Sequence, residues 1–248
     1  MPIPEPRFSR IAAAIADPSR AQMLAALLGG EHRSAGELAS SAGITPQAAS
    51  TQLAHLVDAG LLAVRQQGRH KYFALADSDV AHALEALALI AERDTVSSRW
   101  ERPTYKPLKC ARRCYGHMAG ELGVAQFEML MRCDYLRPAV SNGWQALHLT
   151  NAGSMWLAAL GVALPAKNNA RLAYPCMDWS ERKDHLAGTL AKALLGHYLQ
   201  KDWLRADADS RALATTPLGE RELLPLLAKG VKAEPGPGFG QEPKGINT

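Results

Sequence analysis

The chain has 248 residues, with 28 Lys and Arg against 24 Asp and Glu, and a formal net charge of +4. Its 47% hydrophobic and 21% charged residues are ordinary for a globular protein, which excludes wholesale disorder. No apolar run approaches the ~20 residues that a membrane-spanning helix needs, and the first residues lack a signal-peptide pattern. The four cysteines are too few and too unevenly spaced for a disulfide framework, so we expect a cytoplasmic protein with reduced thiols.

The first residues of the chain predict two helices with a clear start signal between them. An apolar helical pattern covers Phe8–Ala16. Asp17 followed by Pro18 combines an N-cap residue with proline at the first helical position, and two glycines end the predicted helix after Leu28.

Two further helices follow, separated by a glycine-containing turn. Ser34 and Glu37 have the spacing of a capping box and predict a short helix that ends near Ser41. Thr45, which is followed by proline, predicts the start of a second helix that runs to Asp58.

After these helices the apolar pattern changes period. Leu61–Ala63 and Tyr72–Leu75 are apolar and flank a basic stretch with Gly68 near its tip, which is typical of a β-hairpin. Residues 77–94 then return to helical spacing. One apolar stripe of this helix consists of Val80, Leu84, Leu87 and Ala91.

Helix, glycine turn, helix and basic hairpin are the parts of a winged helix-turn-helix. A helix of ~12 residues fits the major groove of B-DNA, and a cationic hairpin tip can reach the phosphates. The alternative is a module that contacts only proteins, but the local cluster of positive charge favours DNA. The candidate DNA-binding residues are Thr45, Gln47, Ser50, Thr51, Gln52, His55, Arg65, Arg69, His70 and Lys71.

This half resembles the ArsR-type (ArsR/SmtB) winged-helix repressors over residues 8–95. The matching motifs are Ala16–Arg20, Leu38–Ala39, Ser50–Leu56, Ala59–Leu62 and Gly68–Tyr72. The resemblance implies a homodimeric regulator, usually a repressor that an inducer releases from operator DNA. It also implies that the terminal helices form the dimer interface, which would include the apolar stripe of residues 77–94. The cysteine pair that often forms the family's metal site in the support helix is missing here, so that site does not transfer.

The second half of the chain has a different composition, because all four cysteines and all five tryptophans follow residue 99. The segment 99–107 contains two prolines and no periodic apolar face, so we expect a linker. We expect residues 108–228 to form a C-terminal sensory domain. Residues 229–248 are dense in Gly and Pro and predict a flexible tail.

Two segments of the second half resemble each other. His117-Met-Ala-Gly-Glu-Leu recurs as His185-Leu-Ala-Gly-Thr-Leu, and Ala146–Gly153 recurs as Ala212–Gly219. We infer two copies of a helix–helix–strand–helix unit, about 67 residues apart. The expected fold class is therefore mainly α: a winged helix-turn-helix with a two-stranded wing, followed by a mainly helical domain of two internal repeats.

One cluster of this half could sense an effector. Cys110, Cys114 and His117 are four and three residues apart and would share one face of a helix. Thiolates and imidazoles suit soft or borderline ions such as Cd, Pb, Zn or As(III), and Cys133 or Cys176 is a candidate fourth ligand.

Other interpretations of the second half remain open. Neighbouring Lys and Arg side chains would lower thiol pKa values, which suits a sensor of oxidation. The aromatic residues could instead line a pocket for a small organic inducer. A free cysteine is also often only a small buried hydrophobic group, and the recurring His-x-Ala-Gly could reflect helix packing.

Motifs of common enzyme classes are missing from the chain. It has no glycine-rich phosphate loop, no nucleophile elbow and no HExxH sequence. We therefore expect a regulator and not an enzyme, with double-stranded operator DNA, a second copy of the chain and an effector as partners, and no membrane.

Overall fold

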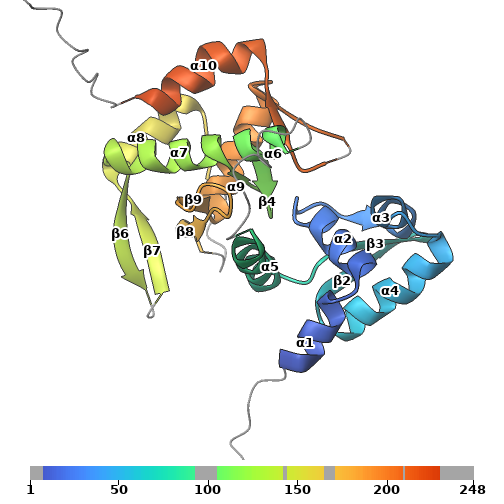
Figure 1. Cartoon of the computed structure of the whole chain (residues 1–248). Coiled ribbons are helices and arrows are strands. Elements are labelled where there is room, and N and C mark those ends of the chain that lie inside the picture. Colours follow the sequence, from blue (N-terminus) through green and yellow to red (C-terminus); the bar gives the residue numbers. More distant parts are fainter. Residues whose placement is uncertain (1–7, 93–104, 142–143, 165–170, 209, 230–248) are drawn as a thin grey trace, which may run out of the picture.

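The computed structural model of the chain describes residues 8–92, 105–141, 144–164, 171–208 and 210–229. Figure 1 shows an N-terminal winged helix beside a C-terminal region, with helix α5 between them. The N-terminal elements are α1 (Phe8–Ile15), α2 (Pro18–Leu27), β1 (Arg33–Ser34), α3 (Ala35–Ala42), α4 (Pro46–Asp58), β2 (Leu62–Gln67), β3 (His70–Leu75) and α5 (Ser78–Ala91).

The predicted helix starts of the first half are confirmed by their capping bonds. Asp17 accepts from the backbone N–H groups of the first turn of α2. Ser34 and Glu37 form the expected capping box at α3, and Thr45 accepts from a backbone N–H of α4. These bonds satisfy donors that the first turn of a helix leaves unpaired, so capping residues in the sequence predict where these helices begin.

The wing is a two-stranded antiparallel hairpin, as predicted, with Gly68 in its turn at φ +60°. Strand β1 adds to the outer side of β3, so the sheet order is β1-β3-β2. The inward faces of the helices and hairpin close one hydrophobic core. Its fully buried members include Met23, Leu24, Leu27, Leu38, Ala49, Leu53 and Leu56.

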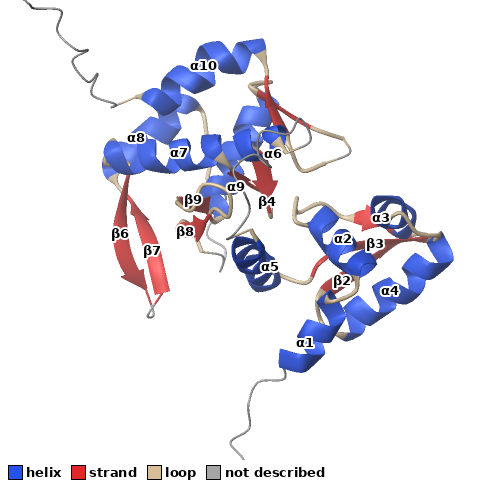
Figure 2. Cartoon of the chain, viewed as in Figure 1, coloured by secondary structure: helices blue, strands red, loops and turns tan. Residues whose placement is uncertain are grey.

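The C-terminal region consists of helices and two-stranded hairpins (Figure 2). Its first elements are α6 (Lys106–Cys110), β4 (Arg112–Cys114), β5 (His117–Ala119), α7 (Glu121–Arg132), β6 (Leu136–Ser141), β7 (Trp144–Leu149) and α8 (Asn151–Leu160). Its last elements are β8 (Tyr174–Met177), β9 (Asp184–Ala187), α9 (Thr189–Gln200), β10 (Leu204–Ala206), β11 (Leu213–Thr215) and α10 (Pro217–Ala228).

The expected helix–helix–strand–helix unit is wrong in its elements. The observed order is hairpin, helix, hairpin, helix, and this order occurs twice. The first hairpin of each set was missed because its strands are only three or four residues long, too short for a period of two to be distinguished from a helical pattern. The helices pack around a core that includes Met129, Leu130, Leu194, Leu195 and Tyr198.

Some expectations fall outside the described residues. Residues 99–104 of the expected linker lie outside the described residues. The end of the expected linker is helical, because α6 begins at Lys106. Residues 230–248 of the expected tail also lie outside the described residues. Within the described ranges, none of the helices combines the length and apolarity that crossing a membrane requires.

The turn between β4 and β5 contacts the winged helix directly. The backbone N–H of Tyr115 donates a 2.6 Å hydrogen bond to the carbonyl of Leu28, just after α2. The Tyr115 side chain packs against the winged-helix core. Gly30 has φ +86°, and a Cβ there would lie 2.9 Å from the backbone nitrogen of Gly116. The two backbones are therefore in close contact.

Helix α5 makes a second contact between the two parts. Arg211, before β11, donates to the buried carboxylate of Glu85 on α5. A 3.3 Å hydrogen bond joins the Tyr174 hydroxyl to Nε2 of His82, and the two rings meet edge to face. The helix expected at the dimer interface thus also packs against the C-terminal region.

Candidate functional site

The outward face of α4 carries most of the predicted DNA-reading side chains. Gln47, Thr51 and His55 are exposed on it. The Thr45 hydroxyl accepts from the backbone at the start of the helix, and the Ser50 hydroxyl donates to the carbonyl of Pro46. Both hydroxyls face solvent while they bond to their own helix, a position from which they can also reach a phosphate.

Gln52 is placed differently from its predicted neighbours. It is half-buried, and its side-chain oxygen accepts a 2.6 Å hydrogen bond from Arg20 of α2. The same guanidinium donates to the carbonyls of Ala13 and Ala14 in α1. Arg20 therefore ties α1 and α4 to α2, and Gln52 contributes to that arrangement. This link was missed because it joins residues 32 positions apart in the sequence.

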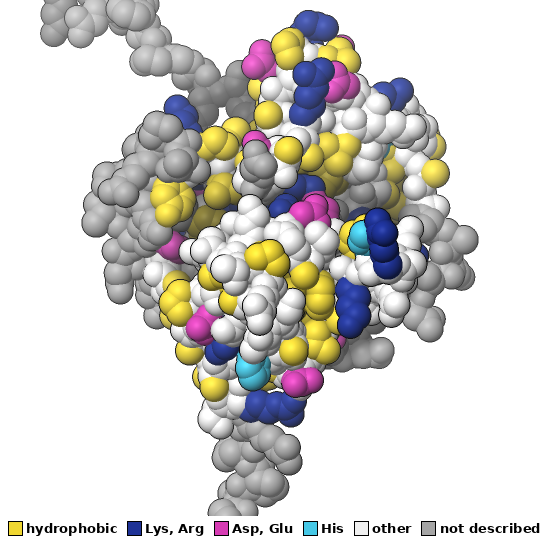
Figure 3. Space-filling model, turned by 90° about the vertical axis from the view of Figure 1, so that its right-hand side faces the viewer, with side chains coloured by type: hydrophobic (Ala, Val, Ile, Leu, Met, Phe, Trp, Pro, Cys, Tyr) yellow, Lys and Arg dark blue, Asp and Glu magenta, His cyan; other side chains and the backbone are white. Residues whose placement is uncertain are grey.

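The wing presents its basic side chains to solvent. Arg65, Arg69, His70 and Lys71 are all exposed. Figure 3 views the molecule from the side of the winged helix and shows Lys and Arg side chains next to a His at the right of this face, with others above and below. A hairpin tip of this charge is attracted to the phosphates of a duplex.

The apolar stripe predicted for the dimer interface changes character along α5. Val80 and Leu84 are half-buried against the winged-helix core, whereas Leu87 and Ala91 are exposed. Leu84, Leu87 and Ala91 line a cavity of about 640 Å³ together with residues of α2 and of the C-terminal region. Part of the stripe therefore packs against other residues of the same chain.

Two hairpins of the C-terminal region each place a thiol opposite an imidazole. Cys114 on β4 pairs with His117 on β5, and Cys176 on β8 pairs with His185 on β9. Tyr115, with φ 48°, forms the turn of the first hairpin together with a glycine at φ 88°, which is the pattern of a two-residue type I′ turn. Strands β5 and β9 contact each other, so the two thiol–imidazole pairs meet.

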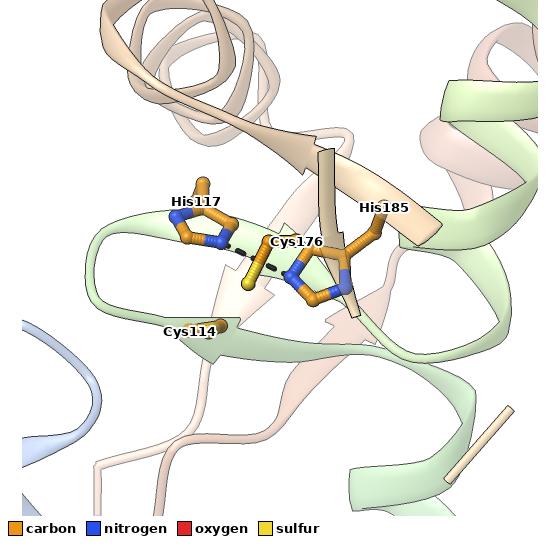
Figure 4. Close-up of side chains that lie close together, drawn as sticks. All are labelled: Cys114, His117, Cys176 and His185. Atoms are coloured by element: carbon orange, nitrogen blue, oxygen red, sulfur yellow. Dashed lines mark hydrogen bonds between the residues drawn. The ribbon is translucent and has the colours of Figure 1, made fainter. Parts of the chain in front are cut away.

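The four side chains form one compact, buried cluster (Figure 4). Their ligand atoms all lie within 4.8 Å of one another, and Nε2 of His117 lies 3.0 Å from Nε2 of His185. Cys114 and His185 have no exposed surface, and Cys176 is 8% exposed. Figure 4 shows the two rings pointing toward each other with the Cys176 sulfur beside them.

The environment of the cluster separates the pKa values of its members. Burial lowers the pKa of His117 to about 4. The neighbouring Cys176 raises the pKa of Cys114, whereas its contacts with Cys114 and both histidines lower the pKa of Cys176. The cluster thus favours a thiolate at Cys176 beside a neutral imidazole at His117.

A buried carboxylate orients the second histidine. Asp178 Oδ2 lies 3.3 Å from Nδ1 of His185 and accepts from the backbone N–H of Gly120, while Oδ1 forms a 2.8 Å ion pair with Arg112. Burial lowers the pKa of His185, but its contacts with Asp178 and Cys176 outweigh burial and raise the value to about 9. Nδ1 of His185 lies beside this carboxylate and Nε2 points into the cluster, an arrangement common among metal-binding histidines.

The donor set fits a tetrahedral metal ion. Two sulfurs and two imidazole nitrogens are the ligands of Cys₂His₂ zinc sites, and the same set accepts other soft or borderline divalent ions. Ligand atoms at bond lengths of about 2.0–2.3 Å from a common ion are themselves about 3–4 Å apart, close to the spacing seen here. The four side chains come from two hairpins, so an ion would join the hairpins to each other.

The cluster differs in two ways from the set predicted from the sequence. The expected common helix face of Cys110, Cys114 and His117 is wrong, because Cys110 ends α6 while the other two lie on strands β4 and β5. Cys110 is half-buried and lies outside the cluster, and burial raises its thiol pKa. His185 stands in the cluster in place of Cys110. Cys176, a candidate fourth ligand, lies there with Cys114 and His117.

The sequence shows His185 as the counterpart of His117, but helix packing explains the recurring His-x-Ala-Gly equally well. The alignment of the two segments without a gap places Cys114 opposite Arg182. The second hairpin has a longer loop between its strands, so the structural counterpart of Cys114 is Cys176. An alignment that allowed this loop to differ would have found both thiol–imidazole pairs.

The chain is similar in sequence to known transcriptional regulators. A family described as "Helix-turn-helix domain" matches residues 15–65. The chain is 38% identical over 217 residues to the Bacillus subtilis protein described as "Uncharacterized HTH-type transcriptional regulator YdfF", covering 87% of this chain and 94% of that protein. It is also 38% identical over 86 residues to the HTH-type transcriptional regulator CmtR of Mycobacterium tuberculosis, covering 35% of this chain and 72% of CmtR.

Two solved structures resemble the N-terminal part. The NMR structure of the cadmium metal-sensor CmtR from Mycobacterium tuberculosis is 40% identical, covers 32% of this chain and 81% of its own, and has a TM-score of 0.28. A homodimeric winged helix-turn-helix domain from Mycobacterium bovis, described as a possible ArsR-family regulator, is 26% identical, covers 39% and 94%, and has a TM-score of 0.34.

The similarity to a regulator along most of its length confirms the expectation of a regulator and not an enzyme. The observed winged helix and the ArsR-type motifs of the first half agree with this similarity. The chain belongs to the ArsR family of winged helix-turn-helix transcriptional regulators and carries an additional C-terminal region.

Proposed function

We propose that the protein is a homodimeric repressor whose affinity for operator DNA changes when a soft or borderline metal ion binds to Cys114, His117, Cys176 and His185. The observation that carries the proposal is the buried meeting of two thiols and two imidazoles from separate hairpins. The relative CmtR is described as a cadmium sensor, which supports an ion of this class as the effector.

The DNA-binding part of the proposal rests on the winged helix. The exposed side chains of α4 enter the major groove, and Arg65, Arg69, His70 and Lys71 of the wing contact the backbone or minor groove beside it. A second copy of the chain would present the same elements to the other half of the operator, with Leu87 and Ala91 of α5 in the interface.

Contacts between the cluster and the winged helix support the link between the ion and DNA. Cys114 and His117 flank the turn whose Tyr115 N–H bonds to Leu28. An ion that draws the two hairpins together would fix this turn, and with it the position of α2 relative to the C-terminal region. The ion supplies a cross-link between strands, and the protein's own turn transmits it.

The double occurrence of hairpin, helix, hairpin and helix supports a further part of the proposal. We infer that the C-terminal region arose as two copies of one unit, each of which contributes one cysteine and one histidine. Cys114 with His117 and Cys176 with His185 then have equivalent positions. This explains why the cluster has two ligands of each kind.

The metal part of the proposal is tested by adding Cd(II) to the purified full-length protein and measuring the bound ion and its ultraviolet thiolate-to-metal absorption. We expect one ion per chain in the wild type. Cys114→Ser and Cys176→Ser should lose the absorption, whereas Cys110→Ser is a matched control that should retain it. Equal binding by all four proteins would place the ion elsewhere and remove the cluster from the account.

A further inference from the structure

The cluster is buried, so an ion needs a path to it. The exposed surface of the four ligand side chains ranges from none at Cys114 to 8% at Cys176. A cavity of about 480 Å³ lies between helix α5 and strand β8, and Cys176 is the cluster member on its wall. The cavity therefore leads from the surface to a residue that carries one of the two thiols.

The wall of this cavity carries further donors for a cation. His82, Glu85 and Met177 line it and offer an imidazole, a carboxylate and a thioether. Glu85 is 3% exposed, and its Oε2 has no hydrogen-bond partner among the described residues, although Oε1 accepts from Arg211. A carboxylate oxygen buried without a partner is costly, and a passing cation would stabilise it.

A contact between Tyr174 and His82 joins the two walls of the cavity. The Tyr174 hydroxyl and Nε2 of His82 are joined by a 3.3 Å hydrogen bond, and their rings meet edge to face at 5.5 Å between centroids. Tyr174 lies two residues before Cys176 on the same strand. This contact therefore connects α5 to the strand that carries the accessible ligand.

We propose that the cavity between α5 and β8 is the path by which the metal ion enters and leaves the cluster, with Cys176 as the first ligand that it meets. The inference rests on the proposed function, since it requires that the four side chains bind an ion. It adds a transient site for a soft divalent cation at His82, Glu85 and Met177. The path concerns rates of loading and release, whereas the four ligands determine affinity.

The experiment follows the binding of Cd(II) alone to the full-length protein by stopped flow, with the equilibrium Kd measured separately. Ala86 is exposed and lines the cavity. We expect Ala86→Trp to slow loading about tenfold with the Kd unchanged, because it obstructs the path without touching a ligand. Tyr174→Phe removes the hydroxyl contact and should speed loading and release together. Leu224→Trp, in a separate cavity beside α7 and α10, is the control and should load at the wild-type rate.

Wild-type loading rates in both Ala86→Trp and Tyr174→Phe would overturn the path while leaving the metal site intact. A change in Kd without a change in loading rate in these variants would also overturn it. Failure of the wild type to bind Cd(II) at the cluster would overturn both the path and the metal part of the proposed function. The equilibrium measurement distinguishes this last outcome from the first two.

Discussion

The backbone N–H of Tyr115 donates to the carbonyl of Leu28 at 2.6 Å, so a turn between two candidate metal ligands is bonded to the end of a helix in the winged domain. The approach is close because Gly30 has no side chain there. Backbone-to-backbone contact of this kind transmits a shift of the turn more directly than contact between flexible side chains.

Gly30→Ala should weaken the link between the cluster and the winged helix. Its φ of +86° would cost an alanine about 1 kcal/mol, and the new Cβ would lie 2.9 Å from a backbone nitrogen. We expect Cd(II) binding close to that of the wild type, but a reduced effect of the ion on DNA affinity in fluorescence anisotropy. Gly36→Ala is the matched control, because no atom lies within 4 Å of its Cβ position. An undiminished effect of the ion in Gly30→Ala would exclude this contact from the coupling.

The combined change Arg69→Ala and Lys71→Ala should weaken DNA binding in a salt-dependent way. Each lost phosphate contact makes the negative slope of log K against log salt shallower by ~0.9. The slope of the double variant should therefore be shallower by about 1.8. Lys201→Ala with Arg205→Ala removes the same charge from exposed positions in the C-terminal region and is the control. If the two double variants have equal slopes, the wing does not contact the phosphates.

Asp178→Asn should destabilise the protein and weaken metal binding together. The change leaves Arg112, which has no exposed surface, without its charged partner, and breaking such a pair costs about 3–5 kcal/mol. It also removes the carboxylate that holds His185, for which a ~10–100-fold loss of metal affinity is typical. Urea unfolding and Cd(II) titration measure the two effects.

Asp202→Asn provides the comparison for Asp178→Asn. Asp202 forms its ion pair with Arg205 on the surface, where such pairs contribute about 0–1 kcal/mol. We expect little change in unfolding free energy and none in metal affinity. A loss of stability as small in Asp178→Asn as in Asp202→Asn would contradict the role given to the buried network.

Gln47→Ala and Gln52→Ala should affect the protein differently, although both were predicted to contact DNA. Gln47 is exposed, so its loss should lower operator affinity and leave the unfolding midpoint unchanged. Gln52 bonds to Arg20, so its loss should lower stability by about 1 kcal/mol. Identical effects of the two changes on both measurements would show that the difference in burial has no consequence.

The winged helix could be predicted from the sequence because its signals are local. Asp17, Ser34 and Thr45 each bond within three residues of themselves, and each marks the start of a helix where the structure has one. The hairpin tip at Gly68 is likewise set by neighbouring residues. Local caps and turns therefore suffice to predict the elements of the first half.

The metal cluster could be predicted only in part, because strand pairing decides which residues meet. Cys176 and His185 become neighbours across a hairpin whose loop differs in length from that of Cys114 and His117. The spacing of Cys110 and Cys114 suggested a shared helix face, but strand β4 directs the second thiol to a different set of partners. Contacts between distant segments leave no mark in the spacing of a single motif.

The most direct test of the account measures the anisotropy of a labelled DNA fragment from upstream of the protein's own gene while Cd(II) is added to the bound complex. We expect one ion per chain to release the DNA from the wild type and from Cys110→Ser, whereas Cys114→Ser and His185→Asn stay bound. Release from all four proteins at the same Cd(II) concentration, or from none of them, would contradict it.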